Sequence, residues 1–371
     1  MKRISFIIYL FFICIRLQAN DGSFWASGNT LFPLKETSIQ LKKEILNLTK
    51  KDGWMQVDVY FEFYNPDTAK VLTVGFVTPP AMGDFAHEVK DHPQIRDFSV
   101  VVNTDTLSYK VSKTNESGFK LADKIIGNED FIYYFNVSFP NGITKIKHSY
   151  LYRGGEGMIA IHSFYYRLTT GTTWANKEIE DFELNIDMGE DIYFSVPYSF
   201  NKKRTDWKVI GIGHINHKKP VYAEHYQYFD SPKLQMAYIR KGKLQYKTKH
   251  FKPSNDLDVD IYEPDYELNT WTQNLKENDF KDLLKYVMPW QDVDSIRAHS
   301  VNLTNRQLQL LINLPYARAG YDFKDIELKK TFSKYLWYMP DTSIQHEFKE
   351  YYYKREVFDI LLAEEKRRKK Q

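Results

Sequence analysis

The segment MQVDVYFEF, residues 55–63, sets the fold class because its apolar and polar residues alternate without interruption. Successive side chains of an extended strand point to opposite faces, so Val57 shares one face with apolar residues and Asp58 shares the other with polar ones. The pattern predicts a β-strand with one face in a core and one in water. Residues 65–67, Asn-Pro-Asp, then signal a turn, and residues 71–77 form a more uniformly apolar run. We predict that these two strands form a hairpin.

Runs of this kind continue to about residue 261, with turn residues between them and no long stretch of helical period. Further strands are predicted at residues 98–102, 107–111, 131–139, 143–152, 158–168, 182–187, 192–196, 207–214 and 234–239. Short strands at this spacing are typical of an antiparallel β-sandwich or a barrel-like fold. We therefore predict a mainly β N-terminal domain.

Beyond residues 256–264, which resemble a hinge, apolar residues recur at the spacing of helices. Thr304 and Gln307 form a capping-box pattern, and Asp325 is placed to cap a further helix. The last predicted helix begins near residue 343. This organisation predicts four segments: a signal peptide at residues 1–19, a β-rich domain at 20–262, a helical linker at 263–299, and a small α-helical domain with a basic tail at 300–371.

The N-terminus has the order of an export signal, with Lys2 and Arg3, an apolar stretch over residues 4–15, and a small-residue cleavage site ending at Ala19. That apolar stretch is too short for the ~20 residues of a spanning helix. We predict a secreted protein, in the periplasm or on the cell surface, without a transmembrane segment after cleavage. Cys14, the only cysteine, leaves with the signal, so the mature chain forms no disulfide within itself.

Removing the signal also balances the charge, because Lys2, Arg3 and Arg16 account for the formal net charge of +3. This leaves 48 of the 51 basic residues against 48 acidic ones. A neutral chain argues against a nucleic-acid partner. The aromatic fraction of 16% has two explanations, ring packing between strands or rings that stack on sugars. The basic tail, residues 364–370, either stabilises the carbonyl end of a helix or contacts an anionic surface.

Histidines are densest at His214, His217 and His225, which are the ligands if the protein holds a metal ion. Solvated loop histidines are the alternative. No cysteine survives cleavage, and the sequence holds no Gly-x-Ser-x-Gly elbow for a nucleophilic serine. We therefore expect no catalytic residues and no cofactor.

Asp256, Asp258 and Asp260 alternate with apolar residues. Three spaced carboxylates suit Ca²⁺, yet Ile261 stands where a calcium loop needs glycine. We predict instead a strand with its apolar residues inside and its carboxylates in solvent.

Residues 314–323 read LPYARAGYDF, and Leu328, Phe332 and the Trp337-Tyr338 pair follow at a fixed distance. Over roughly residues 300–363 the chain resembles a YARHG domain, a family of extracellular bacterial modules named for that signature. Two positions depart from the pattern: Ala319 replaces the signature histidine, and Pro315 is expected to end or kink its helix. Gly320 is a natural helix end.

Residues 164–174, FYYRLTTGTTW, are similar to a Leu-x-Thr-Gly-x-x-Trp segment of a secreted bacterial family of unknown function. Together the two resemblances imply an envelope location and a non-catalytic binding or structural role toward a cell-wall, glycan or envelope-protein partner. The alternative is a hydrolase of envelope polymer, which uses a carboxylate or histidine-based metal site. Contact residues are predicted near the two motifs: Tyr165, Tyr166, Trp174, Arg318, Trp337 and Tyr338. Arg318 has a second interpretation, as a structural staple whose guanidinium is held by Asp322, Asp325 or Glu327.

Overall fold

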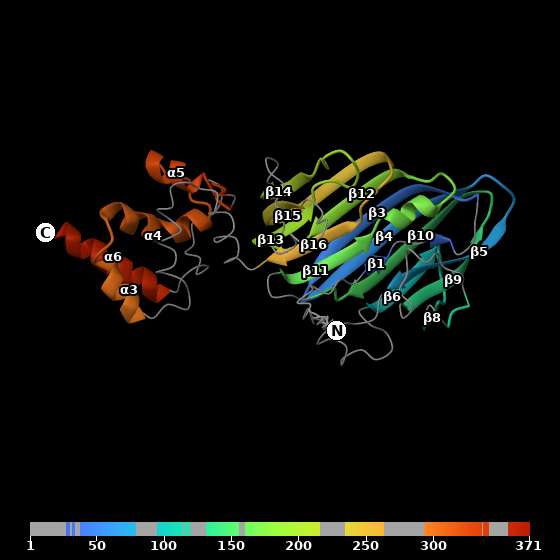
Figure 1. The fold of residues 1–371 in the computed structure, drawn as a ribbon, viewed down its shortest axis with the longest axis horizontal. Coiled ribbons are helices and arrows are strands. Elements are labelled where there is room, and N and C mark those ends of the chain that lie inside the picture. The colour runs from blue at the N-terminus through green and yellow to red at the C-terminus, as the bar shows by residue number, and fades with distance from the viewer. Residues whose placement is uncertain are drawn as a thin grey trace, which may run out of the picture.

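A computed structural model describes residues 27–29, 32–33, 38–78, 95–113, 116–118, 131–155, 160–215, 234–262, 293–335, 337–340 and 355–371. Within these ranges all strands precede all α-helices along the chain (Figure 1). The prediction of a mainly β N-terminal region followed by a helical C-terminal region is confirmed. None of the helices described is long and apolar enough to cross a membrane. The predicted signal peptide, residues 1–19, lies outside the described residues.

The strands form two sheets. The larger sheet contains β1 Ser27–Asn29, β3 Gln40–Lys51, β4 Trp54–Asn65, β6 Ile95–Val102, β7 Asp105–Thr106, β10 Gly142–Tyr152, β11 Ala160–Arg167, β12 Ile179–Asp187, β13 Ile192–Pro197, β14 Lys208–Ile215, β15 Leu234–Phe251 and β16 Leu257–Tyr262. The smaller sheet contains β2 Phe32–Pro33, β5 Lys70–Thr78, β8 Lys110–Lys113 and β9 Phe131–Phe139. Pairing is antiparallel except between β1 and β11 and between β3 and β12.

The long strand β15 joins two halves of the larger sheet. Strands β12 and β13 follow one another along β15, since Ile186 pairs with Leu244 and Ile192 pairs with Ile239. The other neighbour of β12 is β3, whereas the other neighbour of β13 is β16. The sheet therefore divides at this point into a half that contains β3, β4, β10 and β6 and a half that contains β16, β11 and β1.

The predicted hairpin of residues 55–63 and 71–77 is wrong, because the two strands lie in different sheets. Strand β4 pairs with β3 and β10, whereas β5 pairs with β2 and β9. The buried Asn65 side chain donates hydrogen bonds to the carbonyls of Thr68 and Phe139, both at 2.9 Å. These bonds hold a corner rather than a hairpin turn, and the chain crosses from one layer into the other.

Aromatic rings fill the space between the two layers. Phe76 of β5 stacks on Tyr133 of β9 at 5.0 Å between ring centres and lies 5.7 Å from Tyr150 of the larger sheet. His148 of β10 is buried among these rings, with its centre 5.5 Å from that of Phe98. Burial lowers the pKa of His148 to about 3, so the ring is neutral and acts as a core residue.

The Thr-Gly segment closes over a buried acid. After β11 the chain forms a short 3-10 helix, Thr169–Thr173, beside Glu44 of β3. A side chain at Gly171 would place its Cβ 2.7 Å from Ile179 Cδ1, so any larger residue would displace the Ile179 side chain. The hydroxyl of Tyr166 donates to Glu44 Oε1 at 3.4 Å, and Oε2 has no hydrogen-bond partner among the described residues. Burial raises the pKa of Glu44 to about 8.

The helices described are α3 Val293–Ser300, α4 Asn305–Arg318, α5 Ile326–Phe332 and α6 Arg355–Lys369. The capping box of Thr304 and Gln307 is confirmed at the start of α4, and Asp325 caps α5 as predicted. Helix α4 does not end at Pro315 but continues to Arg318. The proline lies in the last turn, so it removes only one backbone hydrogen bond there.

The burial of Glu44 leads us to expect a specific pH dependence of the free energy of unfolding. The pKa of Glu44 in the folded protein lies above its usual value of 4.5, so the free energy of unfolding should fall as the pH rises from 4.5 through about 8. At about 1.4 kcal/mol per pKa unit, this loss is on the order of a few kcal/mol. Glu44→Gln should remove it, and urea unfolding midpoints at acidic and alkaline pH measure it. Glu190→Gln, in an exposed turn, is the matched control. An unchanged pH slope in Glu44→Gln would contradict the assignment.

Candidate functional site

The residues predicted near the Thr-Gly segment separate into one surface position and two core positions. Tyr166 and Trp174 are 2% and 0% exposed, and the Trp174 ring packs 4.3 Å from that of Phe63. This placement gives both a packing role. Tyr165 points to the opposite face of β11 and lines a cavity.

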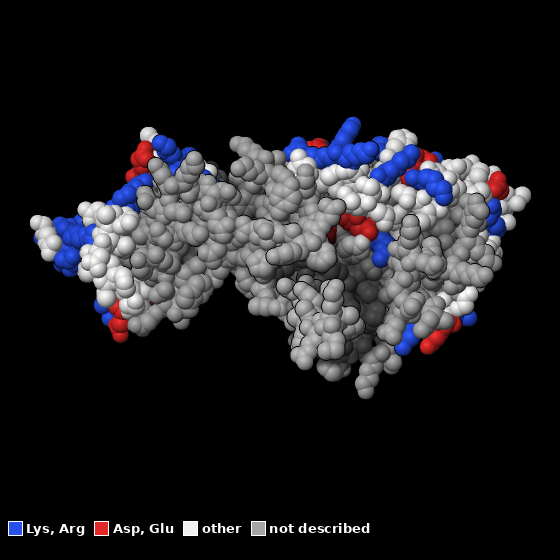
Figure 2. Space-filling model, in the orientation of Figure 1, with Lys and Arg blue, Asp and Glu red and all other residues white. Residues whose placement is uncertain are grey.

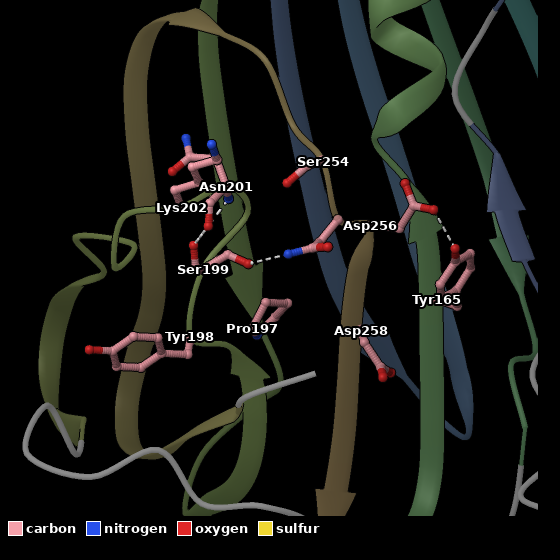
Figure 3. A pocket seen from close by; sticks show the side chains of 10 residues that line it. Tyr165, Pro197, Tyr198, Ser199, Asn201, Lys202, Ser254, Asp256 and Asp258 are labelled. Atoms are coloured by element: carbon pink, nitrogen blue, oxygen red, sulfur yellow. Dashed lines mark hydrogen bonds between the residues drawn. The ribbon is translucent and has the colours of Figure 1, made fainter. Parts of the chain in front are cut away.

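That cavity has a volume of about 580 Å³, within the range of small-molecule sites. Its walls come from the end of β11, the turn after β13 and the start of β16 (Figure 3). The lining residues are Tyr165, Pro197, Tyr198, Ser199, Asn201, Lys202, Ser254, Asn255, Asp256 and Asp258. Hydroxyl, amide and carboxyl groups predominate, so the cavity offers both hydrogen-bond donors and acceptors.

Asp256 is the fixed anion of the cavity. Its carboxylate accepts a short hydrogen bond from the Tyr165 hydroxyl and a second from the Thr169 backbone N–H at 2.8 Å. Partial burial and the negative charge of Asp256 raise the pKa of Tyr165 above its usual value, so the hydroxyl stays protonated as the donor. The two bonds orient the carboxylate, and Figure 3 shows the one from Tyr165.

The opposite wall is held by its own hydrogen bonds. The Asn255 side chain donates to the Ser199 carbonyl at 3.1 Å, and Ser199 Oγ accepts from the Asn201 backbone N–H at the same distance. Trp207, buried behind this turn, donates to the Pro197 carbonyl at 3.0 Å. Because these hydrogen bonds are made within the protein itself, they preorganise the wall.

The prediction that the carboxylates of residues 256–260 face solvent is wrong for two of them. Asp258 and Asp260 on β16 are only 6% and 4% exposed, although the strand itself is present. The reason is that β16 lies between β11 and β13, and both of its faces are covered. Ser163 Oγ donates to Asp260 at 2.6 Å, whereas Asp258 Oδ1 has no hydrogen-bond partner within the described part of the chain.

Burial raises the pKa values of both Asp258 and Asp260. Desolvation, followed by the nearby charge of Asp260, raises the pKa of Asp258 well above its usual range. Desolvation also raises the pKa of Asp260, against the opposing hydrogen bonds from Ser163 and Tyr262. A protonated Asp258 at the cavity wall can donate a hydrogen bond as well as accept one.

Of the three histidines predicted as possible metal ligands, only His214 lies within the described residues. His214 lies on β14 with much of its side chain in solvent. Nearby protein atoms remove part of its hydration, and this desolvation, followed by the charge of Arg240, lowers the pKa of His214. His217 and His225 lie outside the described residues. Among the residues that the structure describes, no three His, Cys, Asp or Glu side chains are grouped so as to hold a metal ion. The metal site stays a prediction.

The signature residues gather where the helical region meets β15. The guanidinium of Arg318 lies 5.1 Å from the ring centre of Tyr238 and 5.0 Å from that of Trp337. The Tyr338 hydroxyl donates to the Tyr321 carbonyl at 3.0 Å. Arg318, Trp337 and Tyr338 are all at least 98% buried, and none of them lines the cavity of Tyr165.

Two of the carboxylates proposed as staples for Arg318 have other partners. Asp322 pairs with Lys329 at 2.6 Å, and Asp325 accepts from the backbone N–H groups of the first turn of α5. Arg318 instead lies against aromatic faces, which attract a guanidinium through their π electrons.

The basic tail contributes one of its arginines to the fold. Arg368 donates to the carbonyls of Ser300, Val301 and Leu303 and to Glu364, so it joins α6 to the end of α3. Figure 2 shows Lys and Arg side chains at the C-terminal end of the molecule. The remaining tail lysines stay candidates for contact with an anionic surface.

Sequence reasoning missed Arg240 and the cavity role of Asp256. Arg240 stands beside a Lys-Gly-Lys run and looks like part of a charged surface. In the sequence, Asp256 is one of three spaced carboxylates, and nothing in that pattern distinguishes it from the other two. Its link to Tyr165 spans 91 positions in the sequence, and no local pattern signals it.

Comparison with known proteins places the C-terminal signature in a family. Residues 285–359 match the family model of the YARHG domain, which confirms that resemblance. The match begins at residue 285, whereas the sequence resemblance begins near residue 300. A solved structure from Legionella pneumophila, provisionally described as a nutrient binding protein, is 17% identical, with a TM-score of 0.48. The alignment covers 93% of this chain and 99% of that one. No curated protein matches the chain.

Proposed function

We propose that this chain is an exported envelope protein that binds a polyhydroxylated ligand, such as a fragment of cell-wall glycan, in the cavity of Tyr165 and Asp256. The single observation that carries the proposal is this cavity of about 580 Å³ with its hydrogen-bonded carboxylate. It is a binding function, and the proposal includes no covalent step.

The lining chemistry supports a neutral, hydroxyl-rich ligand. A sugar hydroxyl both donates and accepts hydrogen bonds, and the cavity presents acceptors at Asp256 and donors at Asn201 and Lys202. Figure 3 shows Tyr165 and Asp256 on one side and Ser199 with its neighbours on the other. A ligand between them would contact both walls, and preorganisation of the walls reduces the entropy lost on binding.

Two further features support the location. Residues 1–19 have the order of an export signal, and the YARHG resemblance implies an extracellular or periplasmic module. With the only cysteine inside the signal, the mature chain needs no oxidation step in that compartment. Periplasm and cell surface both remain within the proposal.

The binding proposal predicts a loss of affinity when the carboxylate is no longer oriented. Tyr165→Phe removes the hydroxyl that holds Asp256, and affinity for soluble cell-wall glycan fragments should fall roughly tenfold, the equivalent of about 1.4 kcal/mol. Isothermal titration calorimetry with the chain from Asn20 onward measures the change. Tyr109→Phe, which removes a hydroxyl from a 40% exposed ring, is the matched control and should bind as the wild type does. Equal affinities for both variants, or no binding by the wild type, would reject the site.

A second function, hydrolysis of an envelope polymer, is favoured by one observation. Asp256 and Asp258 line the same cavity, and burial raises the pKa of Asp258 well above its usual range, which favours a proton donor at one of the two carboxyl groups. This candidate predicts that the wild type releases new reducing ends from cell-wall glycan. Asp258→Asn should abolish the release while binding persists. Binding without any release of reducing ends by the wild type would eliminate hydrolysis and leave the binding proposal standing.

A further inference from the structure

Arg240 of β15 reaches from the sheet into the helical region. Its side chain is 5% exposed, and the two terminal nitrogens donate to different carbonyls, Nη1 to Met339 at 2.9 Å and Nη2 to Arg318 at 3.1 Å. Both acceptors belong to the region that resembles a YARHG domain. A guanidinium presents its donors in a planar fork, and two carbonyls at the ends of that fork match it.

The Arg318 carbonyl is an acceptor left open by the end of helix α4. After α4, the N–H of Tyr321 bonds to the Tyr316 carbonyl at 2.9 Å, and the N–H of Gly320 bonds to the Ala317 carbonyl at 3.0 Å. This closure leaves the Arg318 carbonyl pointing outward, at the negative end of the helix dipole. A cation is favoured at that position, and Arg240 occupies it.

The missing side chain of Gly320 leaves the space that the Arg240 guanidinium occupies. A Cβ at this position would lie 2.3 Å from Arg240 Nη1 and 3.0 Å from the Met339 carbonyl. The backbone of Gly320 has φ +89°, which glycine adopts without strain. The signature glycine therefore serves two purposes, the helix end and the close approach of Arg240.

Aromatic rings complete the surroundings. Arg318 lies over the rings of Tyr238 and Trp337, two residues that belong to the same buried cluster as the helices. The rings of Tyr238 and Trp337 provide a face for the Arg318 guanidinium, while the two carbonyls hold the Arg240 guanidinium.

We infer that the surface formed by the Arg318 carbonyl, Gly320 and the Met339 carbonyl is a guanidinium-binding site, and that Arg240 fills it to dock the YARHG-like region on the β region. The proposed ligand class is a planar guanidinium, supplied here in cis by the sheet. This site is separate from the Tyr165 cavity and does not depend on the proposed glycan binding.

Chemical rescue tests the site directly. Arg240→Ala should lower the thermal unfolding midpoint of the full chain and leave the two carbonyls without a donor. Guanidinium ion, at concentrations too low to unfold the wild type, should raise the midpoint of Arg240→Ala, whereas methylammonium, a cation without the planar fork, should not. Arg297→Ala, which removes an exposed arginine of α3, is the control and should show no rescue. Equal effects of the two cations, or no effect of guanidinium, would overturn the inference.

A glycine comparison keeps the inference testable if Arg240→Ala is too unstable to study alone. Gly320→Ala and Gly189→Ala impose similar backbone strain, at φ +89° and +94°, but the nearest atom to a Cβ at Gly189 is 4.0 Å away. Gly320→Ala should therefore lower the thermal midpoint more than Gly189→Ala does. In an Arg240→Lys background, whose side chain lacks the fork, most of that excess should disappear. An excess that persists in this background would contradict the docking role.

Discussion

The structure depends on one constraint: strand β15 pairs with both halves of the larger sheet and also contacts the helical region. Leu244 of β15 lies in the core between the layers, whereas Tyr238 of the same strand belongs to the cluster formed with the helices. Gly242 allows this change of role, because its φ of +107° and a Cβ position 2.1 Å from the Ile210 carbonyl exclude any other residue. The pairing of β15 with β14 shifts register at Arg240, between Lys241 and Ile239, and the Arg240 side chain reaches the helical region from this bulge.

The chain has to achieve this by burial alone, since its single cysteine lies at position 14. Within the described residues, aromatic rings accordingly contribute to both buried clusters, the one in the β region and the one formed with the helices. Polar groups inside this core cost free energy unless they are hydrogen-bonded, and four of the ionisable ones lie at features to which we assign a role. Glu44 lies beneath the Thr-Gly segment, Asp258 and Asp260 extend from the cavity of Tyr165, and Arg240 joins the two regions.

The parts predictable from sequence are those with local signals. Alternation identified β4, the capping box identified the start of α4, and the signature glycine identified its end. Strand β3 was missed because a bulge after Leu41 and the buried Glu44 break its alternation, and its lysines imitate a solvated helix. The corner at Asn65 was mistaken for a hairpin since both have the same turn residues. The burial of Asp258 and the docking of Arg240 depend on partners far away in the sequence, which no local pattern contains.

The central claim is that one preorganised cavity, built by the turn after β13 and the start of β16, receives the ligand. Hydrogen–deuterium exchange of the mature chain with and without cell-wall glycan fragments tests it most directly. The account predicts that the ligand slows exchange in residues 197–202 and 254–258, while the signature region at residues 316–323 is unaffected. Protection confined to the signature region, or to the polar outer face of β4 and β10, would contradict it.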